Sequence, residues 1–367
     1  MGAWRDFMIT LSLAMIVKNE EAVLARCLDS IKHIVDEMII VDTGSTDQTV
    51  EIAKKYTADV HYFEWIDDFA AARNDAFSKA TKDYIMWLDA DDYLTEDDQQ
   101  KLLALKENFD PTIDVALLKY NLAFDEFGNI TMSNYRERIM KRERNFQWSE
   151  PVHECITPIG NVQQFEIAVT HGDKNRTHSN RNIEIYEKQT ELTPRGTFYY
   201  ARELHTHNRL EEAIVQFEKF LASGLGWRED NITACFDLFT CYTDLGQEQK
   251  GLTYLFQTFL YDLPRARNCC KIGEHFMKVS DFEKAIYWYD KALNPNSHRE
   301  AGFFQQDFCD FIPHMQLCVC FDQIKNHAQA YKHHLAAQQL KPDHSGVKFN
   351  DDYFAKYFSE LKTSLEV

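Results

Sequence analysis

An apolar run that ends in a cluster of acids decides the fold: Tyr84-Ile85-Met86-Trp87-Leu88-Asp89-Ala90-Asp91-Asp92. A short apolar run between polar segments predicts a buried strand. The acids that follow it would then lie at the carboxyl end of that strand. Ligands of open α/β sheets bind at this end, so the stretch joins a structural prediction to a functional one.

Three similar apolar runs precede it, and amphipathic segments separate them. The runs are Leu11–Val17, Met38–Val41 and Val60–Phe63. Between them, Glu21–Ile31 and Phe69–Ala80 carry apolar residues at helical spacing. This alternation predicts a parallel sheet with helices on both faces. The residues that follow each strand are then site candidates, at positions 18–20, 42–44, 64–65 and 89–92.

The alternation loosens between residues 110 and 170. Val115–Phe124 and Phe165–Thr170 are predicted strands, and residues 124–129 are a predicted turn. We expect this stretch to complete the sheet and to form one wall of the site.

From about residue 182 the pattern is helical only, and four helix–turn–helix segments share a small residue. These small residues recur every 34 to 45 positions, at Ala213, Gly251, Ala285 and Ala330. Pro264, Pro295 and Pro342 close three of the units. Small residues let paired helices approach closely, and proline ends a helix. The spacing resembles degenerate tetratricopeptide repeats, and the alternative is an irregular helical bundle.

These patterns predict two domains. Residues 1–185 are expected to form an α/β domain, and residues 186–367 an all-α domain of tetratricopeptide-like helices. In a chain of 367 residues, each half is long enough to bury its own core.

The composition narrows the class of partner. The formal net charge of −18 disfavours nucleic acid and anionic membrane surfaces. No apolar run has the length of a membrane span, and no signal peptide is present, so we expect a cytoplasmic protein without membrane insertion. The nine cysteines are scattered without zinc-site spacing, which predicts reduced and buried thiols.

The carboxylates of Asp89, Asp91 and Asp92 are the strongest chemical signal. Like charges this close repel one another unless a cation lies among them. Oxygen ligands suit Mg²⁺ or Mn²⁺, which are often held by one or two carboxylates together with substrate phosphates. We therefore expect a divalent cation here. The alternative is an acidic loop that caps the helix beginning near Thr95.

A second signal is the stretch 39–47, in which a strand ends in Asp42 and a Gly/Ser turn follows. The acid can accept hydrogen bonds from a base or a ribose, and the backbone N–H groups of the turn can hold an anion. The alternative is that Ser45 or Thr46 caps the next helix while Asp42 braces the turn.

In their order along the chain, these motifs resemble glycosyltransferase family 2, the large inverting family with the GT-A fold. The resemblance rests on residues 14–21, 41–47, 72–74 and 89–92, and it extends over about residues 10 to 180. It implies a nucleotide-diphosphate sugar as the donor, expected to be a UDP-sugar. The residues implied to contact the donor are Val17, Asn19, Glu20, Asp42, Thr43, Arg73, Asn74, Asp89 and Ala90.

One subset of family 2 joins the GT-A domain to tetratricopeptide-like helices and includes the sublancin-type peptide S-glycosyltransferases. This chain is similar to that subset at Val152-His153-Glu154, at His171 and at residues 201–205. The similarity implies Glu154 and His153 as catalytic residues. It also implies a metal, Mg²⁺ or Mn²⁺, on Asp89, Asp91 and His171.

The implied reaction is a single displacement that inverts the anomeric carbon. Glu154, oriented by His153, would take the proton of an acceptor hydroxyl or thiol. The metal would neutralise the leaving diphosphate. From the residues alone, two alternatives stay open: Glu154 as a member of a structural ion pair, and His171 as an ordinary loop histidine.

The helical repeats predict a concave surface suited to an extended peptide or to a second subunit. We therefore expect a peptide or protein Ser, Thr or Cys side chain as the acceptor, with a glycan as the alternative, and a homo-oligomer through the helical domain is a further possibility. The aromatic-rich stretches Phe198–Tyr200, Tyr287–Tyr289 and Phe303-Phe304 either line that surface or fill the core between helices.

Two rival functions follow from other classes. A nucleotidyltransferase would need a Gly-rich basic loop after the first strand, and Lys18-Asn19-Glu20-Glu21 contains no glycine. A catalytically silent domain that supports a repeat scaffold would not need Asp89, Asp91 and Glu154, all of which are present. Neither rival accounts for the acids as well as a metal-dependent hexosyltransferase does.

Overall fold

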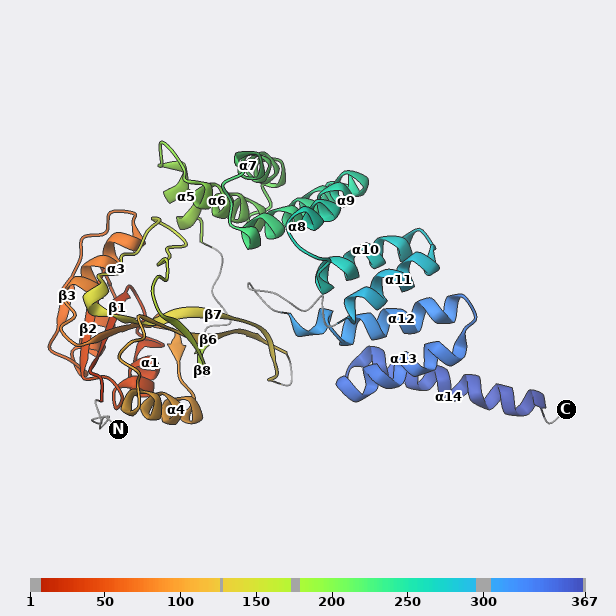
Figure 1. Ribbon diagram of the computed structural model, residues 1–367, viewed down its shortest axis with the longest axis horizontal. Coiled ribbons are helices and arrows are strands. Elements are labelled where there is room, and N and C mark those ends of the chain that lie inside the picture. The colour runs from red at the N-terminus through yellow and green to blue at the C-terminus, as the bar shows by residue number, and fades with distance from the viewer. Residues whose placement is uncertain (1–7, 126–127, 173–178, 295–304, 366–367) are drawn as a thin grey trace. The chain divides into compact units, whose positions relative to one another are not determined.

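The computed structural model describes residues 8–125, 128–172, 179–294 and 305–365. The chain divides into two compact units, Met1–Glu203 and Leu204–Val367. The boundary predicted at residue 185 falls inside helix α5 (Arg181–Glu187). The predicted fold class, an α/β unit followed by an all-helical one, is confirmed (Figure 1).

The first unit is built on one eight-stranded sheet with the order β3-β2-β1-β4-β7-β6-β8-β5. Its strands are β1 (Leu11–Val17), β2 (Glu37–Asp42), β3 (Val60–Tyr62), β4 (Tyr84–Trp87), β5 (Asp92–Tyr93), β6 (Val115–Phe124), β7 (Ile130–Lys141) and β8 (Val162–His171). The four strands of the alternating pattern pair in parallel, as predicted. The whole sheet is mixed, however, because β7 runs antiparallel to both β4 and β6. A hairpin such as β6–β7 needs no helical crossover, so the strand–helix alternation stops there.

Six helices belong wholly or mainly to this unit: α1 (Leu24–Ile31), α2 (Thr49–Ala53), α3 (Phe69–Ser78), α4 (Glu96–Glu107), α5 (Arg181–Glu187) and α6 (Pro194–Thr206). A short 3₁₀ helix, η1 (Arg142–Arg144), follows β7. Figure 1 shows α1 and α4 on one side of the first strands and α3 on the other. The helices therefore cover both faces of the parallel half.

Side-chain alternation along β1 explains the two layers. Leu11, Leu13 and Met15 are fully buried in a core that also contains α1 and α4. Ala14, between them in sequence, packs in a second core with α3. Successive residues of a strand point to opposite faces, and β1 is apolar throughout because both of its faces are covered.

The second unit consists of consecutive helices. They are α7 (Leu210–Ser223), α8 (Arg228–Asp244), α9 (Glu248–Gln257), α10 (Ala266–Lys278), α11 (Phe282–Ala292), α12 (Phe311–Gln323), α13 (His327–Leu340) and α14 (Ser345–Leu365), with 3₁₀ helices η2 (Thr258–Leu260) and η4 (Gln306–Phe308). Helices α8 and α9, α10 and α11, and α12 and α13 pack as antiparallel neighbours joined by short turns (Figure 1).

The small residues of the repeat pattern lie where paired helices touch. Ala213, Ala285 and Ala330 are fully buried. A Cβ atom added at Gly251 would lie only 2.9 Å from the carbonyl oxygen of Phe239 on the neighbouring helix. The spacing read from the sequence therefore marks close helix contacts.

The prolines and aromatic residues of this region agree with the sequence predictions only in part. Pro264 precedes α10, and Pro342 follows the end of α13. Tyr289 is buried between helices, whereas Tyr287 is 54% exposed. Pro295 and the pair Phe303-Phe304 lie outside the described residues.

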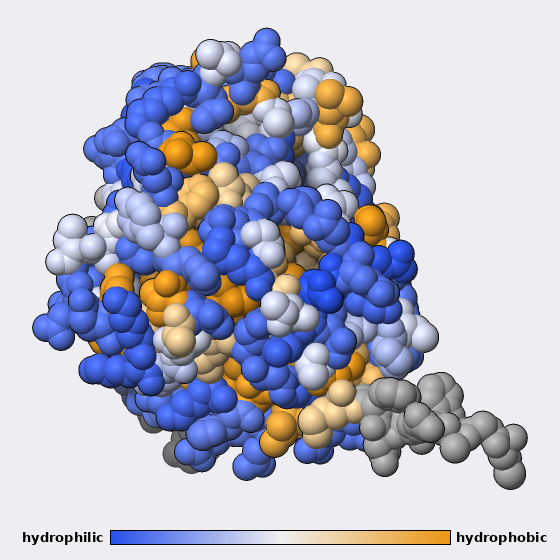
Figure 2. Space-filling view, turned by 90° about the vertical axis from the view of Figure 1, so that its left-hand side faces the viewer, coloured by the Kyte–Doolittle hydropathy of each residue, from blue (hydrophilic) through white to orange (hydrophobic). Residues whose placement is uncertain are grey.

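The surface agrees with the charged composition. The face seen in Figure 2 is dominated by hydrophilic residues, and hydrophobic residues show in small separate groups. All nine cysteines are free, and eight of them are buried. In the described parts of the chain, no helix combines the length and the apolar character that crossing a membrane requires.

Candidate active site

The turn after β2 is braced by the carboxylate of Asp42. It accepts hydrogen bonds from the backbone N–H groups of Gly44, at 3.0 Å, and of Ser45, at 3.1 Å. Thr43 is tied to β1, because its backbone N–H and its hydroxyl both donate to the carbonyl of Val17. The geometry gives Asp42 the bracing role of the alternative interpretation. Neither Ser45 nor Thr46 caps the next helix, because α2 begins at the N-cap Gln48 without a side-chain cap.

The loop after β1 interlocks with this turn. Asn19 has the left-handed φ of 56°, and its Oδ1 accepts a hydrogen bond of 2.8 Å from the backbone of Thr46. In return, its own N–H donates to Ser45 Oγ at 3.0 Å. The N–H of Glu20 donates to Thr49 Oγ1 at 2.7 Å. Hydrogen bonds therefore join the loops that follow the carboxyl ends of β1 and β2.

The acids after β4 have different partners. Asp89 Oδ1 accepts a hydrogen bond of 2.7 Å from Arg73 Nη2. Asp92 forms an ion pair of 3.0 Å with Arg138, and neither side chain has any exposed surface. Ala90 is buried between these two positions. Asp89 and Asp92 are thus held by different arginines from different elements of the sheet unit.

Asp91, Asp92 and His171 bring ligand atoms within 4.8 Å of one another. His171 is the last residue of β8 and pairs directly with Asp92 in the sheet. Its Nδ1 lies 3.8 Å from Asp91 Oδ1 and 3.7 Å from Asp92 Oδ1. Carboxylates suit Mg²⁺ and Mn²⁺, and imidazole suits transition metals, so this set fits Mn²⁺ best. Two of the three predicted ligands come together here, and Asp89 lies outside the group, on Arg73.

Arg73 is the centre of the cluster. Its Nε donates a hydrogen bond of 2.6 Å to Glu154 Oε1, while its Nη2 bonds Asp89. The guanidinium carbon lies 5.0 Å from the ring centre of Trp87 and 4.9 Å from that of Trp148. Stacking between two indoles and bonding to two carboxylates fixes both the plane and the direction of the guanidinium.

Asn74 fixes the position of Trp148, one of the two indoles beside Arg73. Its side-chain amide donates to the carbonyl of Trp148 at 3.0 Å and accepts from the N–H of Trp148 at 2.8 Å. The same helix, α3, begins at the N-cap Asp68, whose side chain accepts from the backbone of Ala71. Asn74 therefore positions Trp148.

The loop that carries Glu154 is pinned at both ends. Ser149 and Cys155 form an isolated antiparallel bridge. Within the loop, Glu150 and His153 have φ values of 73° and 53°. Such left-handed residues are unfavourable unless their surroundings hold them. Here α3, α5 and α6 supply those contacts: the N–H of Phe69 and the hydroxyl of Tyr186 donate to carbonyls of the loop, and Arg195 donates to the carbonyl of His153.

His153 points away from its neighbour Glu154. Its Nε2 lies 2.7 Å from Glu203 Oε1, and its ring stacks on Tyr199 with ring centres 4.4 Å apart. Both partners are on α6. The structure therefore places Glu154 with Arg73 and His153 with α6, and it does not bring the two predicted catalytic side chains into contact.

Neighbouring charges determine the ionisation of the cluster. Burial opposes ionisation of Asp89, but Arg73 and Arg138 outweigh it and lower its pKa to about 2. Burial also opposes the charge of Arg73, but Asp89 and Glu154 outweigh it and raise the pKa of Arg73. A hydrogen bond to Asp92 raises the pKa of His171. At neutral pH, Asp89 and Arg73 are therefore a charged pair.

Most of the α/β unit matches a known family. Residues 12–161 match the sequence profile of the family described as glycosyl transferase family 2. The α/β unit contains a glycosyl transferase family 2 domain. The match begins in β1 and ends just before β8, so the family 2 domain includes Asp89, Asp91 and Glu154.

Individual curated relatives match different shares of this chain. A TPR repeat-containing protein of Synechococcus elongatus is 36% identical over 149 residues, which are 41% of this chain and 36% of that protein. The SPbeta prophage-derived glycosyltransferase SunS of Bacillus subtilis is 29% identical over 226 residues, which are 57% of this chain and 53% of SunS. The matched part of the chain thus spans about a third to a half of these curated relatives.

Among solved structures, residues 1–349 of TarS of S. aureus align with a TM-score of 0.39 and 14% sequence identity. The alignment covers 67% of this chain and 90% of that one.

Two buried side chains of the family 2 domain are missing from the sequence predictions. Tyr120 donates a hydrogen bond of 2.9 Å to Asp92 Oδ1. Arg138 lies 3.9 Å from the ring centre of Trp87 and 4.5 Å from that of Tyr120. Arg138 belongs to Arg136-Glu137-Arg138 in β7, and such a charged triplet normally indicates a solvated strand face. Only the pairing of β7 with β4 and β6 brings it beneath the acids.

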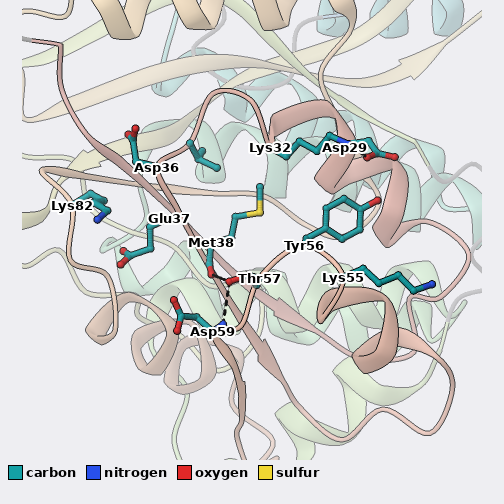
Figure 3. Close-up of a pocket in the computed structure, with 11 residues that line it drawn as sticks. Asp29, Lys32, Asp36, Glu37, Met38, Lys55, Tyr56, Thr57, Asp59 and Lys82 are labelled. Atoms are coloured by element: carbon teal, nitrogen blue, oxygen red, sulfur yellow. Dashed lines mark hydrogen bonds and ion pairs between the residues drawn. The ribbon is translucent and has the colours of Figure 1, made fainter.

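A pocket of the family 2 domain lies at the other end of the parallel strands from the candidate active site (Figure 3). It is lined by residues at the amino ends of β2, β3 and β4, among them Asp36, Glu37, Asp59 and Lys82. Lys32, also on its rim, pairs with Asp29 at 2.7 Å. Ligands of parallel strands bind at the carboxyl ends, so this pocket is not the candidate active site.

Proposed function

We propose that this chain is a metal-dependent inverting glycosyltransferase that moves a sugar from a UDP-sugar to a side chain of a peptide or protein. The family 2 domain would hold the donor, and the helical unit would contribute to the choice of acceptor. Mg²⁺ or Mn²⁺ would be required with the donor.

The observation that carries this proposal is the bridge from Asp89 through Arg73 to Glu154. A single guanidinium contacts both Asp89, the first acid after β4, and Glu154, the candidate base. A displacement at the anomeric carbon needs the leaving diphosphate and the incoming acceptor on opposite sides of the sugar, both near the reacting atom. One arginine between the two carboxylates keeps those two halves of the site at a fixed spacing.

On the donor side, Asp91 and His171 would hold the cation together with the diphosphate, and Asp92 lies in the same group. The bound cation would supply charge neutralisation for the leaving diphosphate. Arg73 offers a second positive charge on the same side. A diphosphate would compete with Asp89 for it, because guanidinium binds phosphate with the same forked geometry as carboxylate.

On the acceptor side, Glu154 is the candidate base. Its Oε1 accepts from Arg73, which leaves Oε2 as the atom for the acceptor proton. Its side chain is 14% exposed, so it is sheltered from solvent but reachable. The braced loop 149–155 keeps it in place, and a preorganised carboxylate can act as a general base without rearrangement.

A peptide or protein acceptor is supported by the helical unit, whereas the similarity to the glycosyltransferase SunS supports sugar transfer itself. Paired helices with small residues at their contacts form the kind of surface that binds extended segments. A transferase that extends a glycan is the alternative within the same chemistry. The alternative without sugar transfer is a catalytically inactive domain that serves as a scaffold.

The proposal is tested by incubating the full chain with Mn²⁺ and each member of a panel of nucleotide sugars, and by measuring nucleotide release. We expect slow, metal-dependent release of UDP from one UDP-sugar, lost in Asp91→Asn. A matched control is Asp97→Asn, since Asp97 is 74% exposed on α4 and away from the cluster. If no nucleotide sugar binds or is cleaved, the transferase proposal is wrong and the scaffold remains.

A further inference from the structure

Helix α1 holds the backbone of the acid loop, which we define as residues 89–94 and which includes β5. Arg26 Nη2 donates a hydrogen bond of 3.2 Å to the carbonyl oxygen of Asp91. The thiol of the next residue, Cys27, donates to the carbonyl oxygen of Asp89 at 3.4 Å. Both bonds go to the main chain and not to a carboxylate. The helix therefore fixes the path of the loop without using an oxygen that suits a divalent cation.

A third contact, one turn further along α1, fastens the end of the acid loop. Ser30 Oγ accepts a hydrogen bond of 3.2 Å from the backbone N–H of Leu94 and donates one of 2.7 Å to the carbonyl of Cys27. Ser30 and Cys27 are both buried. Residues three and four positions apart lie on the same side of a helix. Positions 26, 27 and 30 therefore form one side of α1 that follows the acid loop along its length.

Arg26 also reaches the end of β8. The carbonyl oxygen of Asp91 accepts a second hydrogen bond, of 3.0 Å, from the backbone N–H of Gly172, the residue after His171. A Cβ atom added at Gly172 would lie 2.0 Å from Arg26 Nη2, so the guanidinium lies directly against this glycine. The guanidinium carbon is 4.8 Å from the ring centre of Tyr93 on β5. Arg26 thus contacts the acid loop and the residue that follows His171 at one point.

The acid loop needs this support because its carboxylates repel one another. Asp91 is 2% exposed and lies between Asp89 and Asp92 in the sequence. Like charges that share a buried site are unfavourable, and turning one of them outward relieves the repulsion. Two hydrogen bonds to the carbonyl of Asp91 oppose that movement. The positive charge of Arg26 at the same carbonyl offsets part of the repulsion.

We propose that Arg26 is a positioning residue that keeps Asp91 beside His171 and so holds this group ready for a divalent cation. It acts on the main chain, at the carbonyl of Asp91 and at Gly172, whereas the cation would be bound by side chains. The inference rests on the proposed function, because it takes Asp91 and His171 as metal ligands. Its chemical basis is general: residues that orient the ligands of a metal contribute to its affinity.

Metal binding is the first readout, measured by calorimetric titration of the full chain with Mn²⁺ in the presence of UDP. We expect Arg26→Gln to bind Mn²⁺ about tenfold more weakly than the wild type, the usual loss when a residue that orients a ligand is removed. Arg26→Lys should recover part of the affinity, because an ammonium group can donate to the same carbonyl. Wild-type affinity in Arg26→Gln, or equal losses in both variants, would overturn the inference.

A matched control separates positioning from a general effect of charge. Lys32 directly follows α1, and its side chain is 39% exposed and pairs with Asp29. Lys32→Gln removes one positive charge from the same helix end of the sheet unit without touching the acid loop. We expect wild-type Mn²⁺ affinity in Lys32→Gln. An equal loss in Lys32→Gln and Arg26→Gln would contradict a specific role of Arg26.

Hydrogen exchange of the metal-free chain is the second readout and does not depend on the proposed function. The amide of Gly172 donates to Asp91, so it exchanges when the acid loop opens. We expect this amide to exchange about tenfold faster in Arg26→Gln, as the loss of one charge-assisted hydrogen bond predicts. The amide of Thr43, bonded to Val17, should keep its rate. Equal exchange of Gly172 in both proteins would overturn the inference. If the wild type binds no Mn²⁺, the proposed function fails, and the exchange rates still decide whether Arg26 holds the loop.

Discussion

Arg73 donates a hydrogen bond of 2.6 Å from Nε to Glu154 Oε1 across 81 positions of sequence. The contact joins α3, which packs on the parallel half of the sheet, to the loop between β7 and β8. Because the same guanidinium bonds Asp89, a change at any one of these three groups alters the environment of the other two. Both carboxylates are therefore hydrogen-bonded to the same guanidinium.

Replacing Glu154 by Gln tests whether Glu154 acts as the general base. The amide oxygen of Gln can still accept from Arg73, so the cluster should keep its geometry, but the amide cannot take a proton. We expect sugar transfer to fall by about 10² to 10⁴-fold, the usual contribution of a general base, while UDP binds as in the wild type. The measurement is the rate of product formation together with UDP affinity. Glu150→Gln, four residues earlier in the same loop, is the control, and equal losses in both variants would show that Glu154 has no special role.

Replacing Gly172 by Ala tests whether close packing against the backbone of Asp91 is needed for metal binding. A Cβ atom there would lie 2.0 Å from Arg26 Nη2 and 2.7 Å from the carbonyl oxygen of Asp91. The side chain of Arg26 can move, but the backbone of Asp91 can do so only by shifting the acid loop. We expect weaker Mn²⁺ binding in the presence of UDP, measured by calorimetry, with a wild-type circular dichroism spectrum. Unchanged Mn²⁺ affinity would show that the loop tolerates this shift.

Replacing Gly251 by Ala tests the close helix packing of the repeats. Alanine is a better helix former than glycine by about 1 kcal/mol. A Cβ 2.9 Å from the carbonyl of Phe239 opposes this gain, and overpacking costs about 1 to 3 kcal/mol. We expect a net loss of stability in the helical unit, measured by urea unfolding. Gln249→Ala, exposed on the same helix, should cause almost no loss, and stabilisation by Gly251→Ala would contradict the packing described here.

A half-buried histidine pair should make the helical unit sensitive to acid. His314 Nδ1 on α12 lies 2.9 Å from His333 Nδ1 on α13, and burial lowers the pKa of both, that of His333 to about 4. Asp310 near His314 raises its pKa, while Lys332 lowers both. Because the folded pKa is depressed, the folded state binds fewer protons than the unfolded chain. The stabilisation is therefore complete above the unfolded pKa of about 6.5 and is lost as the pH falls toward about 4.

The expected size of this effect is of order 1 kcal/mol between pH 7 and pH 5, after allowance for partial exposure. It is measured as the urea midpoint of the helical unit at several pH values. His333→Gln should flatten the pH dependence, and His33→Gln, at an exposed position of the first unit, should leave it unchanged. A wild-type midpoint that is constant from pH 7 to pH 5 would contradict the assignment.

The local pattern of the sequence predicts the first half of the fold well. Leu11–Val17 and Val115–Phe124 are strands with the predicted bounds. The predicted strand Phe165–Thr170 extends to Val162–His171. Strand β7 is not predicted, since its polar residues lie on a strand that pairs on both sides and show no clean alternation.

The site is predictable only in part, because some of its residues come together only through strand pairing and helix packing. The acids after β4 and the Arg73-Asn74 pair are visible because they belong to motifs that are contiguous in sequence. Arg138 and Tyr120 are visible only after β7 has been placed beside β4, and β6 beside β7, because both residues are far from the acids in the sequence. The direction of His153 is equally hidden, because it depends on Glu203 of α6, 50 positions further on.

The most direct test of the central claim is calorimetric titration of the full chain with UDP, with Mn²⁺ and with a chelator in its place, for the wild type and for Asp91→Asn. The account predicts that the wild type binds UDP in Mn²⁺ and loses most of that affinity in chelator, and that Asp91→Asn binds weakly in both. UDP binding of equal strength in chelator and in Mn²⁺, unchanged by Asp91→Asn, would contradict it.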